Sequence, residues 1–401
     1  MPTNTSPALD ETFSIILIDE KKQKFLGFKN PYEIQLWYPK YRVDLIENKR
    51  HPSTPAEFHK ELLNIKFDKN FDNPCIIHLF YEFGTCFVDE EHLMPEDSLL
   101  GIVIRYKDTF EYFPEKHGRV TGLKKKSSPS WEKYERSFKK GHDHLLRGNC
   151  YQFNLTCPYE YSFSRENRIW DFIDGLWGKQ NVASAYAHAT WLPSKSVLYL
   201  SNSPECLFQI KREKDNMKLW SMPIKGSVKT GPDFNFDESW KELVSSEKNQ
   251  AELYMIADLL RNDLSKIEKP NARVVRKKCP LLVPGILHQY SLIDVKLSYD
   301  VSLGKIVEAL FPGGSITGAP KKSVVGILDD LENWERGFYC GSTIVLYKEI
   351  LACSINIRSA VIDFLKFNIL YGAGGGITLL SSAEEEFCEM QLKVDSFFDQ
   401  F

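Results

Sequence analysis

Hydrophobic residues along the chain recur with two periods, which together predict a mixture of helices and strands. Spacings of three and four, typical of a helix with one buried face, mark segments 131–147, 249–267, 321–334 and 382–398. Weaker helical spacing is present in 56–67 and in part of 234–247. These segments predict four clear helices and two less certain ones.

Strand-like runs outnumber the helical segments and are rich in β-branched and aromatic residues. They are 13–28 as two strands around a charged turn, 35–45, 75–83, 101–113 as a strand pair, 148–163, 196–210 as two strands, 219–227 ending in a Lys-Gly turn, 338–347, 350–362 and 364–371. Because helices and strands do not alternate strictly, the pattern predicts an α+β fold.

One polar segment interrupts this pattern and suggests a boundary. Residues 118–130 are basic and broken by glycine, serine and proline, as expected of a linker or long loop. We therefore expect an N-terminal part, 1–130, and a larger part, 131–401. The N-terminal part is short, and we expect it to form a subdomain of a shared core.

Composition narrows the class of protein. The 401 residues are 43% hydrophobic, with 51 basic and 54 acidic side chains and a net charge of −3, so nothing indicates binding to nucleic acid or a membrane. There is no 18-residue apolar run and no signal peptide. Nine cysteines without C-x-x-C spacing argue against zinc and against a disulfide framework. We expect a cytoplasmic enzyme.

A glycine-rich segment, FPGGSITGAPK at 311–321, precedes one of the clear helices. Free backbone N–H groups at such a helix N-terminus favour an anion. The segment is not a nucleotide-binding P-loop, because Ala319 and Pro320 stand where lysine and serine or threonine are required. A carboxylate ligand is as consistent as a phosphate, and a tight loop without a ligand remains an alternative.

Two further patterns carry possible chemistry near the C-terminus. GAGGG at 372–376 predicts a second loop with exposed backbone N–H groups. In the final helix, Glu386, Glu389 and Lys393 share one face because they are three and four residues apart. A solvated helix with i, i+4 ion pairs is the simpler interpretation of that face.

Several motifs then occur in one order between about residue 131 and the C-terminus. They are SPE (203–205), PIKGS (223–227), AELYMIADLLRNDL (251–264), YCGS (339–342), NIRS (356–359), GAGGGI (372–377) and EEEFCEMQLK (384–393). With the glycine segment, this set resembles the chorismate-utilising enzymes, and within them aminodeoxychorismate synthase component I and anthranilate synthase component I. The resemblance implies the chorismate-utilising-enzyme fold, a large antiparallel two-sheet core with helices packed outside, and makes 131–401 the chorismate-binding catalytic region.

The resemblance implies two catalytic residues. Lys225 occupies the position of the nucleophile in aminodeoxychorismate synthases, where anthranilate synthases have alanine. Glu205 matches the general acid that protonates the departing hydroxyl at C4 of chorismate, a role that requires burial to keep its pKa up. Without the resemblance, an exposed turn lysine and a surface glutamate would be the simpler interpretations.

A substrate-binding set is implied in the same way. Gln152 stands where relatives that add water carry a base lysine, and ammonia needs no such base because it is already nucleophilic. Arg358 matches the arginine that holds the enolpyruvyl carboxylate with two parallel hydrogen bonds. The remaining positions carried over from the family are Ser227, His288, Thr317, Gly318, Gly374, Gly375 and Lys393.

The resemblance also implies Mg²⁺, with Glu252 and Glu389 as ligands and Glu386 beside them. Oxygen ligands suit this ion, which would bridge the protein to an anionic substrate. Two residues depart from the family. Asn249 replaces an acidic residue one turn before Glu252, and Val345 replaces a tyrosine that contacts the enolpyruvyl carboxylate.

The expected reaction is amination of chorismate with ammonia to 4-amino-4-deoxychorismate, in the branch that leads to p-aminobenzoate and folate. Lys393 lies eight residues before the C-terminus, so we expect a separate glutaminase subunit to supply ammonia. A downstream aminodeoxychorismate lyase would complete p-aminobenzoate. The alternatives are anthranilate synthase component I and a catalytically inactive relative that binds and regulates a glutaminase.

Overall fold

The computed structural model describes residues 7–88, 94–115, 119–178, 183–230, 234–268, 272–283 and 286–401. Its helices are α1 (Pro55–Leu63), α2 (Tyr81–Val88), α3 (Trp131–Leu146), α4 (Ile169–Trp177), α5 (Phe236–Ser245), α6 (Glu247–Ile267), α7 (Leu303–Leu310), α8 (Gly314–Thr317), α9 (Lys321–Leu331) and α10 (Ala383–Phe398), with a 3₁₀ turn at Pro193–Lys195.

The strands are β1 (Phe13–Asp19), β2 (Lys24–Trp37), β3 (Tyr41–Asp44), β4 (Lys49–Pro52), β5 (Cys75–Leu79), β6 (Gly101–Tyr112), β7 (Lys124–Ser127), β8 (Gln152–Ser162), β9 (Tyr186–Leu192), β10 (Val197–Ser203), β11 (Cys206–Arg212), β12 (Met217–Met222), β13 (Ile224–Lys229), β14 (Arg273–Val283), β15 (Ile286–Leu297), β16 (Gly318–Ala319), β17 (Ser342–Tyr347), β18 (Ile350–Ile355), β19 (Ser359–Asp363) and β20 (Asn368–Ile377). Every pairing between these described strands is antiparallel.

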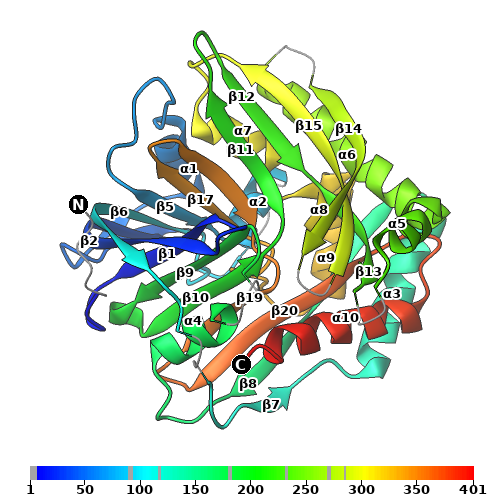
Figure 1. Cartoon of the computed structure of the whole chain (residues 1–401), viewed down its shortest axis with the longest axis horizontal. Coiled ribbons are helices and arrows are strands. Elements are labelled where there is room, and N and C mark those ends of the chain that lie inside the picture. Colours follow the sequence, from blue (N-terminus) through cyan, green and yellow to red (C-terminus); the bar gives the residue numbers. More distant parts are fainter. Residues whose placement is uncertain are drawn as a thin grey trace.

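The strands form one long series that folds over into layers. From β8 the pairing runs through β20, β19, β10, β9, β1, β2, β6, β5, β17, β18, β11 and β12 to β15. Figure 1 shows β8 and β20 beside α10 and α3 in the lower part, and β11, β12, β14 and β15 in the upper part near α6 and α7. This antiparallel core with outer helices confirms the expected α+β class.

Three apolar clusters hold the layers together. One lies between β8, β20 and the helices α3, α4, α9 and α10. A second joins α1, α2, α6 and α7 to β5, β11, β12, β15, β17 and β18. A third is built from β1, β2, β5, β6, β10 and β17, where strand faces meet without a helix between them. The upper and lower parts of the sheet series therefore share an interior. Burial of these apolar side chains provides the main driving force for folding.

The clear helices begin where side chains can cap them. Ser130, Ser246 and Ser382 precede α3, α6 and α10, and each hydroxyl accepts a hydrogen bond from a backbone N–H in the first turn. At α1, Thr54 and Glu57 form a reciprocal capping box with Pro55 between them. The periodic segments predicted at 131–147, 249–267, 321–334 and 382–398 are all helical, within a few residues at their ends.

Several strand predictions were wrong in detail. The run 75–83 is a strand only through Leu79, and α2 begins at Tyr81. The expected strand pair at 101–113 is the single strand β6, and 350–362 is broken into β18 and β19. Runs of buried apolar residues look alike whether the backbone is extended or helical, so the period alone could not separate these cases.

The segment 118–130 is more than a linker where the structure describes it. Residues Lys124–Ser127 form β7, which pairs with β8 at the edge of the sheet. Strands from both sides of this segment also pair with each other, since β1 pairs with β9 and β5 pairs with β17. The division at residue 130 remains a prediction.

Two other expectations concern the whole chain. All nine cysteine thiols are unpaired, as their spacing predicted. Among the described helices, none combines the length and the apolar character needed to cross a membrane.

A buried histidine pair lies in the shared interior. Nδ1 of His78 is 2.9 Å from Oγ1 of Thr343, and Nε2 is 2.9 Å from Oγ1 of Thr190. The ring of His188 lies 6.0 Å away, centroid to centroid. Burial lowers the pKa of His188 to about 4, and burial followed by the charge of His188 lowers the pKa of His78 well below its usual value. Both rings are therefore neutral at pH 7.

This pair predicts that stability falls with acidity. In the unfolded chain each histidine titrates near 6.5, so below that pH the unfolded state binds more protons than the folded state. The free energy of unfolding should fall by up to about 1.4 kcal/mol per pH unit for each such histidine, from pH 6.5 down to the folded pKa. Urea unfolding between pH 7 and 5 measures the slope. His188→Gln should flatten it and His51→Gln, on β4, should not; equal slopes in all three proteins would contradict the assignment.

Candidate active site

Lys225 lies in a bulge rather than in the expected turn. Lys225 and Gly226 belong to β13, whose register with β15 shifts between Ile224 and Ser227. Gly226 has φ of 79°, in the left-handed region that glycine adopts without strain. A β-bulge of this kind re-aims the neighbouring side chains. The bulge allows Lys225 and Ser227, which flank Gly226, to contact different parts of one site.

The glycine run 372–376 was predicted to be a loop, and that prediction was wrong. These residues form part of β20, paired along their whole length with β8. The glycines are needed because functional side chains occupy the space above them. A β-carbon on Gly376 would collide with Nε2 of Gln152 and lie 2.8 Å from Nζ of Lys225. The strand thus provides room instead of backbone N–H groups.

The neighbouring glycine brings a second group of side chains close. A β-carbon on Gly375 would lie 2.9 Å from Oε2 of Glu386 and 4.0 Å from Nζ of Lys393. Nζ of Lys393 also donates to the carbonyl of Gly374 at 3.0 Å. Because adjacent residues of a strand point to opposite faces, the Lys225 group and the charged face of α10 approach β20 from its two sides.

Glu205 has the environment that a general acid needs. It lies between β10 and β11 and is 5% exposed. Burial raises the pKa of its carboxyl, and the nearby Ser315 hydroxyl and Lys225 ammonium lower it in part. Within the described part of the chain, Oε1 of Glu205 has no hydrogen-bond partner. A carboxyl in this setting favours its protonated, donating form.

Gln152 is fully buried at the start of β8. Its backbone pairs with Ala319 of β16, but neither atom of its side-chain amide has a partner among the described residues. A buried polar group without a partner is costly, and such groups are few in folded proteins. The amide next to Lys225 is therefore suited to a polar ligand or an ordered water.

Ser227, His288 and Arg358 form a chain of contacts. Oγ of Ser227 is 2.8 Å from Nδ1 of His288, and Nε2 of that ring is 3.5 Å from the Arg358 guanidinium. Burial first, and Arg358 second, lower the pKa of His288 to about 3, so the ring is neutral. Lys393 and Glu389 also influence this pKa, which puts them in the same neighbourhood.

Arg358 is a half-buried cation at the end of this series of contacts. Burial lowers the pKa of its guanidinium, opposed by Tyr371, yet an arginine keeps its charge in proteins. Among the residues that the structure describes, no acidic side chain forms an ion pair with it. Such a charge favours an anionic ligand, and a carboxylate matches the planar fork.

The acidic residues predicted to bind metal come from two helices. On α10, Glu386 is 5% exposed and accepts a hydrogen bond from Ser381, whereas the exposed Glu389 pairs with Lys393 at 2.9 Å. Glu252 is half-buried on α6, the helix whose start packs against β13. In the described ranges, no three histidine, cysteine or acidic side chains converge as a metal site.

The glycine-rich segment supports the other side of the site. Thr317 is fully buried at the end of the one-turn helix α8. Gly318 has φ of 136°, and a β-carbon there would collide with the carbonyl oxygen of Gln152. Only glycine allows β16 to approach β8 this closely. The segment therefore fixes Gln152 through the backbone.

The structure thus brings Lys225, Gln152 and Glu205 together. The contacting side chains of Ser227, His288 and Arg358 lie next to this group. The motifs did not indicate the contributions of Ser315 and Tyr371. Ser315 lies inside the glycine segment, so its position there was the available signal. Nothing in the local pattern marked Tyr371.

The chain matches the family described as chorismate binding enzyme over residues 32–399. The chain belongs to this family. Among curated relatives, it is 32% identical over 347 residues to the chloroplastic aminodeoxychorismate synthase of Arabidopsis thaliana, covering 82% of this chain and 35% of that protein. It is 32% identical over 281 residues to aminodeoxychorismate synthase component 1 of Escherichia coli (strain K12), covering 68% of this chain and 58% of the relative.

Solved structures of this family share the fold. Anthranilate synthase component I from Streptococcus pneumoniae superimposes with a TM-score of 0.77 at 19% identity, covering 99% of this chain and 94% of that one. A structure described as a 2,3-dihydroxybenzoate-specific isochorismate synthase, DhbC, from Bacillus anthracis has a TM-score of 0.73 at 17% identity. The match covers 98% of this chain and 97% of that one. These structures confirm the expected chorismate-utilising-enzyme fold.

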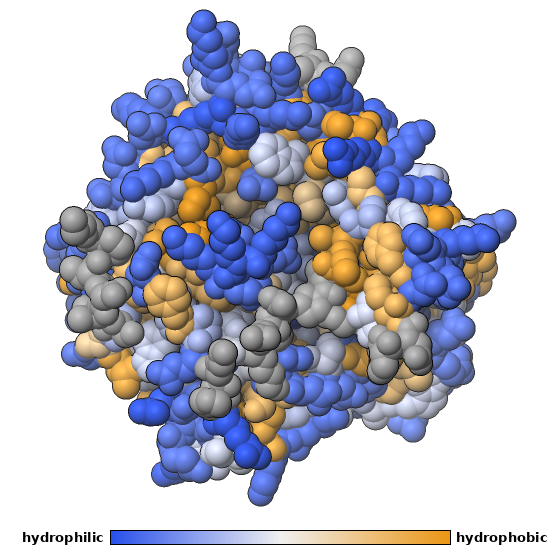
Figure 2. Space-filling view, in the orientation of Figure 1, coloured by the Kyte–Doolittle hydropathy of each residue, from blue (hydrophilic) through white to orange (hydrophobic). Residues whose placement is uncertain are grey.

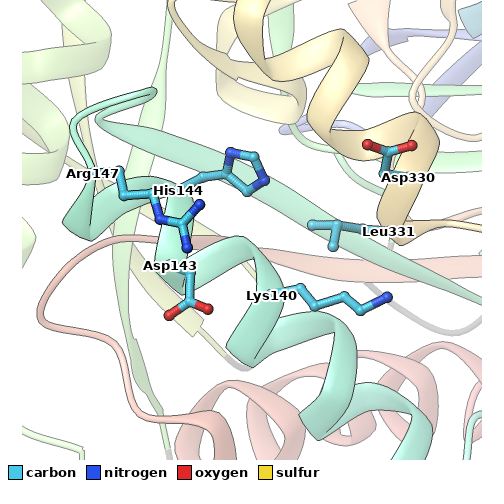
Figure 3. Close-up of a pocket in the computed structure, with 6 residues that line it drawn as sticks. All are labelled: Lys140, Asp143, His144, Arg147, Asp330 and Leu331. Atoms are coloured by element: carbon cyan, nitrogen blue, oxygen red, sulfur yellow. The ribbon is translucent and has the colours of Figure 1, made fainter.

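The surface of this family member is mostly polar on the face in Figure 2, with apolar patches near its centre. A surface pocket of about 350 Å³ lies between α3 and α9. Figure 3 shows its lining, in which Lys140, Asp143, His144 and Arg147 come from α3 or its end, and Asp330 and Leu331 come from α9. None of the predicted site residues lines this pocket.

The space above β20 yields a prediction. In Gly376→Ala the new methyl group would displace the ends of Lys225 and Gln152, which are flexible, so the melting temperature should change little. The conversion of chorismate proposed below should fall at least about tenfold, because such groups act only when accurately placed. Gly326→Ala, at an exposed helical position with no atom within 4 Å of the new carbon, is the matched control and should keep full activity. Parental activity in Gly376→Ala would show that the two side chains do not act there.

Proposed function

We propose that this chain aminates chorismate, converting chorismate and ammonia into 4-amino-4-deoxychorismate and water. The observation that carries the proposal is the position of Lys225 over Gly376 and beside Gln152. The buried acid Glu205 lies close enough for the charge of Lys225 to lower its pKa. The chain spans 35% and 58% of the relatives that carry this activity in their names, so the activity is inferred for it.

The anion-binding groups suit chorismate, which carries two carboxylates. The fork of Arg358 would take the enolpyruvyl carboxylate, next to the neutral ring of His288 and the hydroxyl of Ser227. Lys393, held over Gly375 by the Gly374 carbonyl, would approach the ring carboxylate. Thr317 and Gly318 would border the substrate from the glycine segment. These contacts would hold the ring above Lys225.

The chemistry then needs one nucleophile and one acid. The unprotonated amine of Lys225 attacks C2, both ring double bonds shift by one position toward C4, and the C4–O bond breaks. Glu205 gives its proton to the departing hydroxyl, which leaves as water. Ammonia attacks C4, both double bonds shift back, and the bond between C2 and Lys225 breaks. The proton that ammonia loses returns to Glu205. Covalent catalysis of this kind divides one difficult displacement into two easier ones.

Gln152 supports ammonia over water as the incoming group. Water must lose a proton before it attacks, and an amide side chain cannot act as the base. The amide can instead hydrogen-bond an amine or water near C4, using atoms that lack partners in the described protein. We therefore expect little isochorismate among the products.

Mg²⁺ is proposed as the cofactor. The donors on α10 are carboxylates, and Glu386 directs one oxygen into the space above Gly375. Magnesium sites commonly take one or two protein carboxylates and fill the remaining positions with water and substrate. Glu252 and Glu389 would hold the ion, which would supply positive charge to stabilise a carboxylate of the substrate.

The proposed partners follow from the reaction. The Escherichia coli relative is named component 1, which supports a separate glutaminase as the source of ammonia. An aminodeoxychorismate lyase would act on the product. A cytoplasmic location remains a prediction, and the Arabidopsis relative is named chloroplastic.

Anthranilate synthase activity is the second candidate, because the Streptococcus structure has the same fold. That reaction would eliminate pyruvate from the same pocket. The third possibility, an inactive relative that regulates a glutaminase, rests on the two departures from the family, Asn249 and Val345. Val345 packs in the apolar interior. Mass analysis of the product from chorismate, Mg²⁺ and an ammonium salt separates the three possibilities.

The metal proposal predicts that Glu252→Gln and Glu389→Gln each reduce Mg²⁺-dependent turnover by at least about a hundredfold, because a carboxylate ligand becomes a weaker neutral one. Circular dichroism should show folded proteins. Glu384→Gln, an exposed residue of the same helix, is the control and should respond to Mg²⁺ like the parent. Unchanged Mg²⁺ titrations in both ligand variants would remove the assignment.

The nucleophile predicts a covalent adduct. With chorismate and Mg²⁺ but no ammonia, the protein mass should increase by chorismate minus water, on the peptide that contains Lys225. Lys225→Ala should form no adduct and lose most aminodeoxychorismate synthesis, and residual turnover should shift toward attack of ammonia at C2. If Lys225→Ala makes aminodeoxychorismate at the parental rate, the lysine is a structural residue.

A further inference from the structure

Strand β8 has a gap in its outer edge. At one end its residues Gln152 and Phe153 pair with β16, and at the other end residues 160–162 pair with β7. Between these points, in the part of the sheet that the structure describes, no strand pairs with this edge of β8. Backbone groups in such a gap need other partners if they are buried.

The side chains of Glu332 and Arg336 take the place of the missing strand. Oε1 of Glu332 accepts the backbone N–H of Thr156 at 2.7 Å. The Arg336 guanidinium donates to the carbonyl of Asn154 at 2.6 Å and to that of Ile316 at 2.7 Å. Arg336 therefore bridges β8, which carries Gln152, and α8 of the glycine segment.

The two side chains form a buried ion pair. The nitrogen–oxygen distances between them are 2.7 and 2.8 Å. The side chain of Arg336 is 1% exposed and that of Glu332 is 6% exposed. Burial acts to lower the pKa of Arg336, but Glu332 keeps it well above its ordinary value. The ring of Tyr81 lies 4.5 Å from the guanidinium carbon. A lysine could carry the charge but could not reproduce the planar set of donors.

We propose that Arg336, held by Glu332, is a positioning residue that sets the distance between Gln152 and the Thr317–Gly318 wall of the active site. The kinetic part of this inference rests on the proposed function. Arg336 touches neither side chain, and it acts through the carbonyls of Asn154 and Ile316. A change at Arg336 would let β8 and α8 move relative to each other.

This role predicts a specific kinetic pattern. The proposed chorismate anchors, Arg358 and Lys393, come from the β18–β19 connection and from α10, and neither has a contact with Arg336 among the described interactions. Loss of Arg336 should therefore disturb the delivery of ammonia near Gln152 more than the binding of chorismate. A merely structural role would lower the amount of active enzyme and leave both KM values unchanged.

The test compares Arg336→Lys, Arg336→Gln and Glu332→Gln with the parent. Arg336→Lys keeps the charge against Glu332 and guards against a variant that fails to fold. Lys218→Gln, which removes an ion pair to the buried Asp294 on β15, is the matched control. We expect kcat/KM for ammonium to fall about 10- to 100-fold in Arg336→Lys, with KM for chorismate within about threefold of the parent.

Hydrogen exchange provides a readout that does not depend on turnover. Peptides covering 150–158 and 313–320 should exchange faster in the Arg336 variants, and the rest of the protein should match the parent. Parental kinetics and parental exchange in folded Arg336→Lys and Arg336→Gln would overturn the inference, as would a uniform rise in exchange. An inactive parent would instead contradict the proposed function, and the exchange pattern would still decide the positioning role.

Discussion

Space on both faces of β20, at the adjacent glycines 375 and 376, is the constraint that the rest of the site depends on. Any side chain at Gly376 would occupy the volume taken by Lys225 and Gln152, and one at Gly375 would meet Glu386 and Lys393. The bulge in β13, the start of β8 and one face of α10 all direct polar groups toward this strip of bare backbone. An antiparallel sheet supports this arrangement because its regular pairing keeps the strip rigid while three separate elements approach it.

Burial then gives each polar group its character. Glu205 lies in an apolar turn between strands, which raises its pKa and favours the neutral acid. His288 is kept neutral by burial and by Arg358, so it adds no charge between the Ser227 hydroxyl and that guanidinium. Glu389 and Lys393 on α10 are more exposed, which suits side chains that exchange an internal ion pair for a ligand. One site thus combines a dry catalytic part with a wetter binding part.

Sequence reasoning recovered the elements whose periodicity was strong and the motifs that the family shares. It found α3, α6, α9 and α10, and it named Lys225, Gln152 and Glu205. It could not place Lys225 against Gln152, which is 73 positions earlier in the chain, because strand pairing between distant segments decides that contact. It also took the glycines at 372–376 for a loop, since glycine more often marks turns than strands that make room for neighbours. Arg336 and Glu332 carried no local signal, because their importance arises from a gap in a sheet edge formed elsewhere.

The setting of Arg358 has a consequence for the balance between stability and function. A half-buried charge with no acidic partner among the described residues costs stability, because less water solvates it. The conformation of this residue adds to that effect, since its φ of 50° lies in a region that non-glycine residues seldom adopt. An anion that pairs with the guanidinium relieves the electrostatic part, so its binding and the stability of the fold are thermodynamically linked. Part of the affinity for an anion would then come from relief of this electrostatic cost.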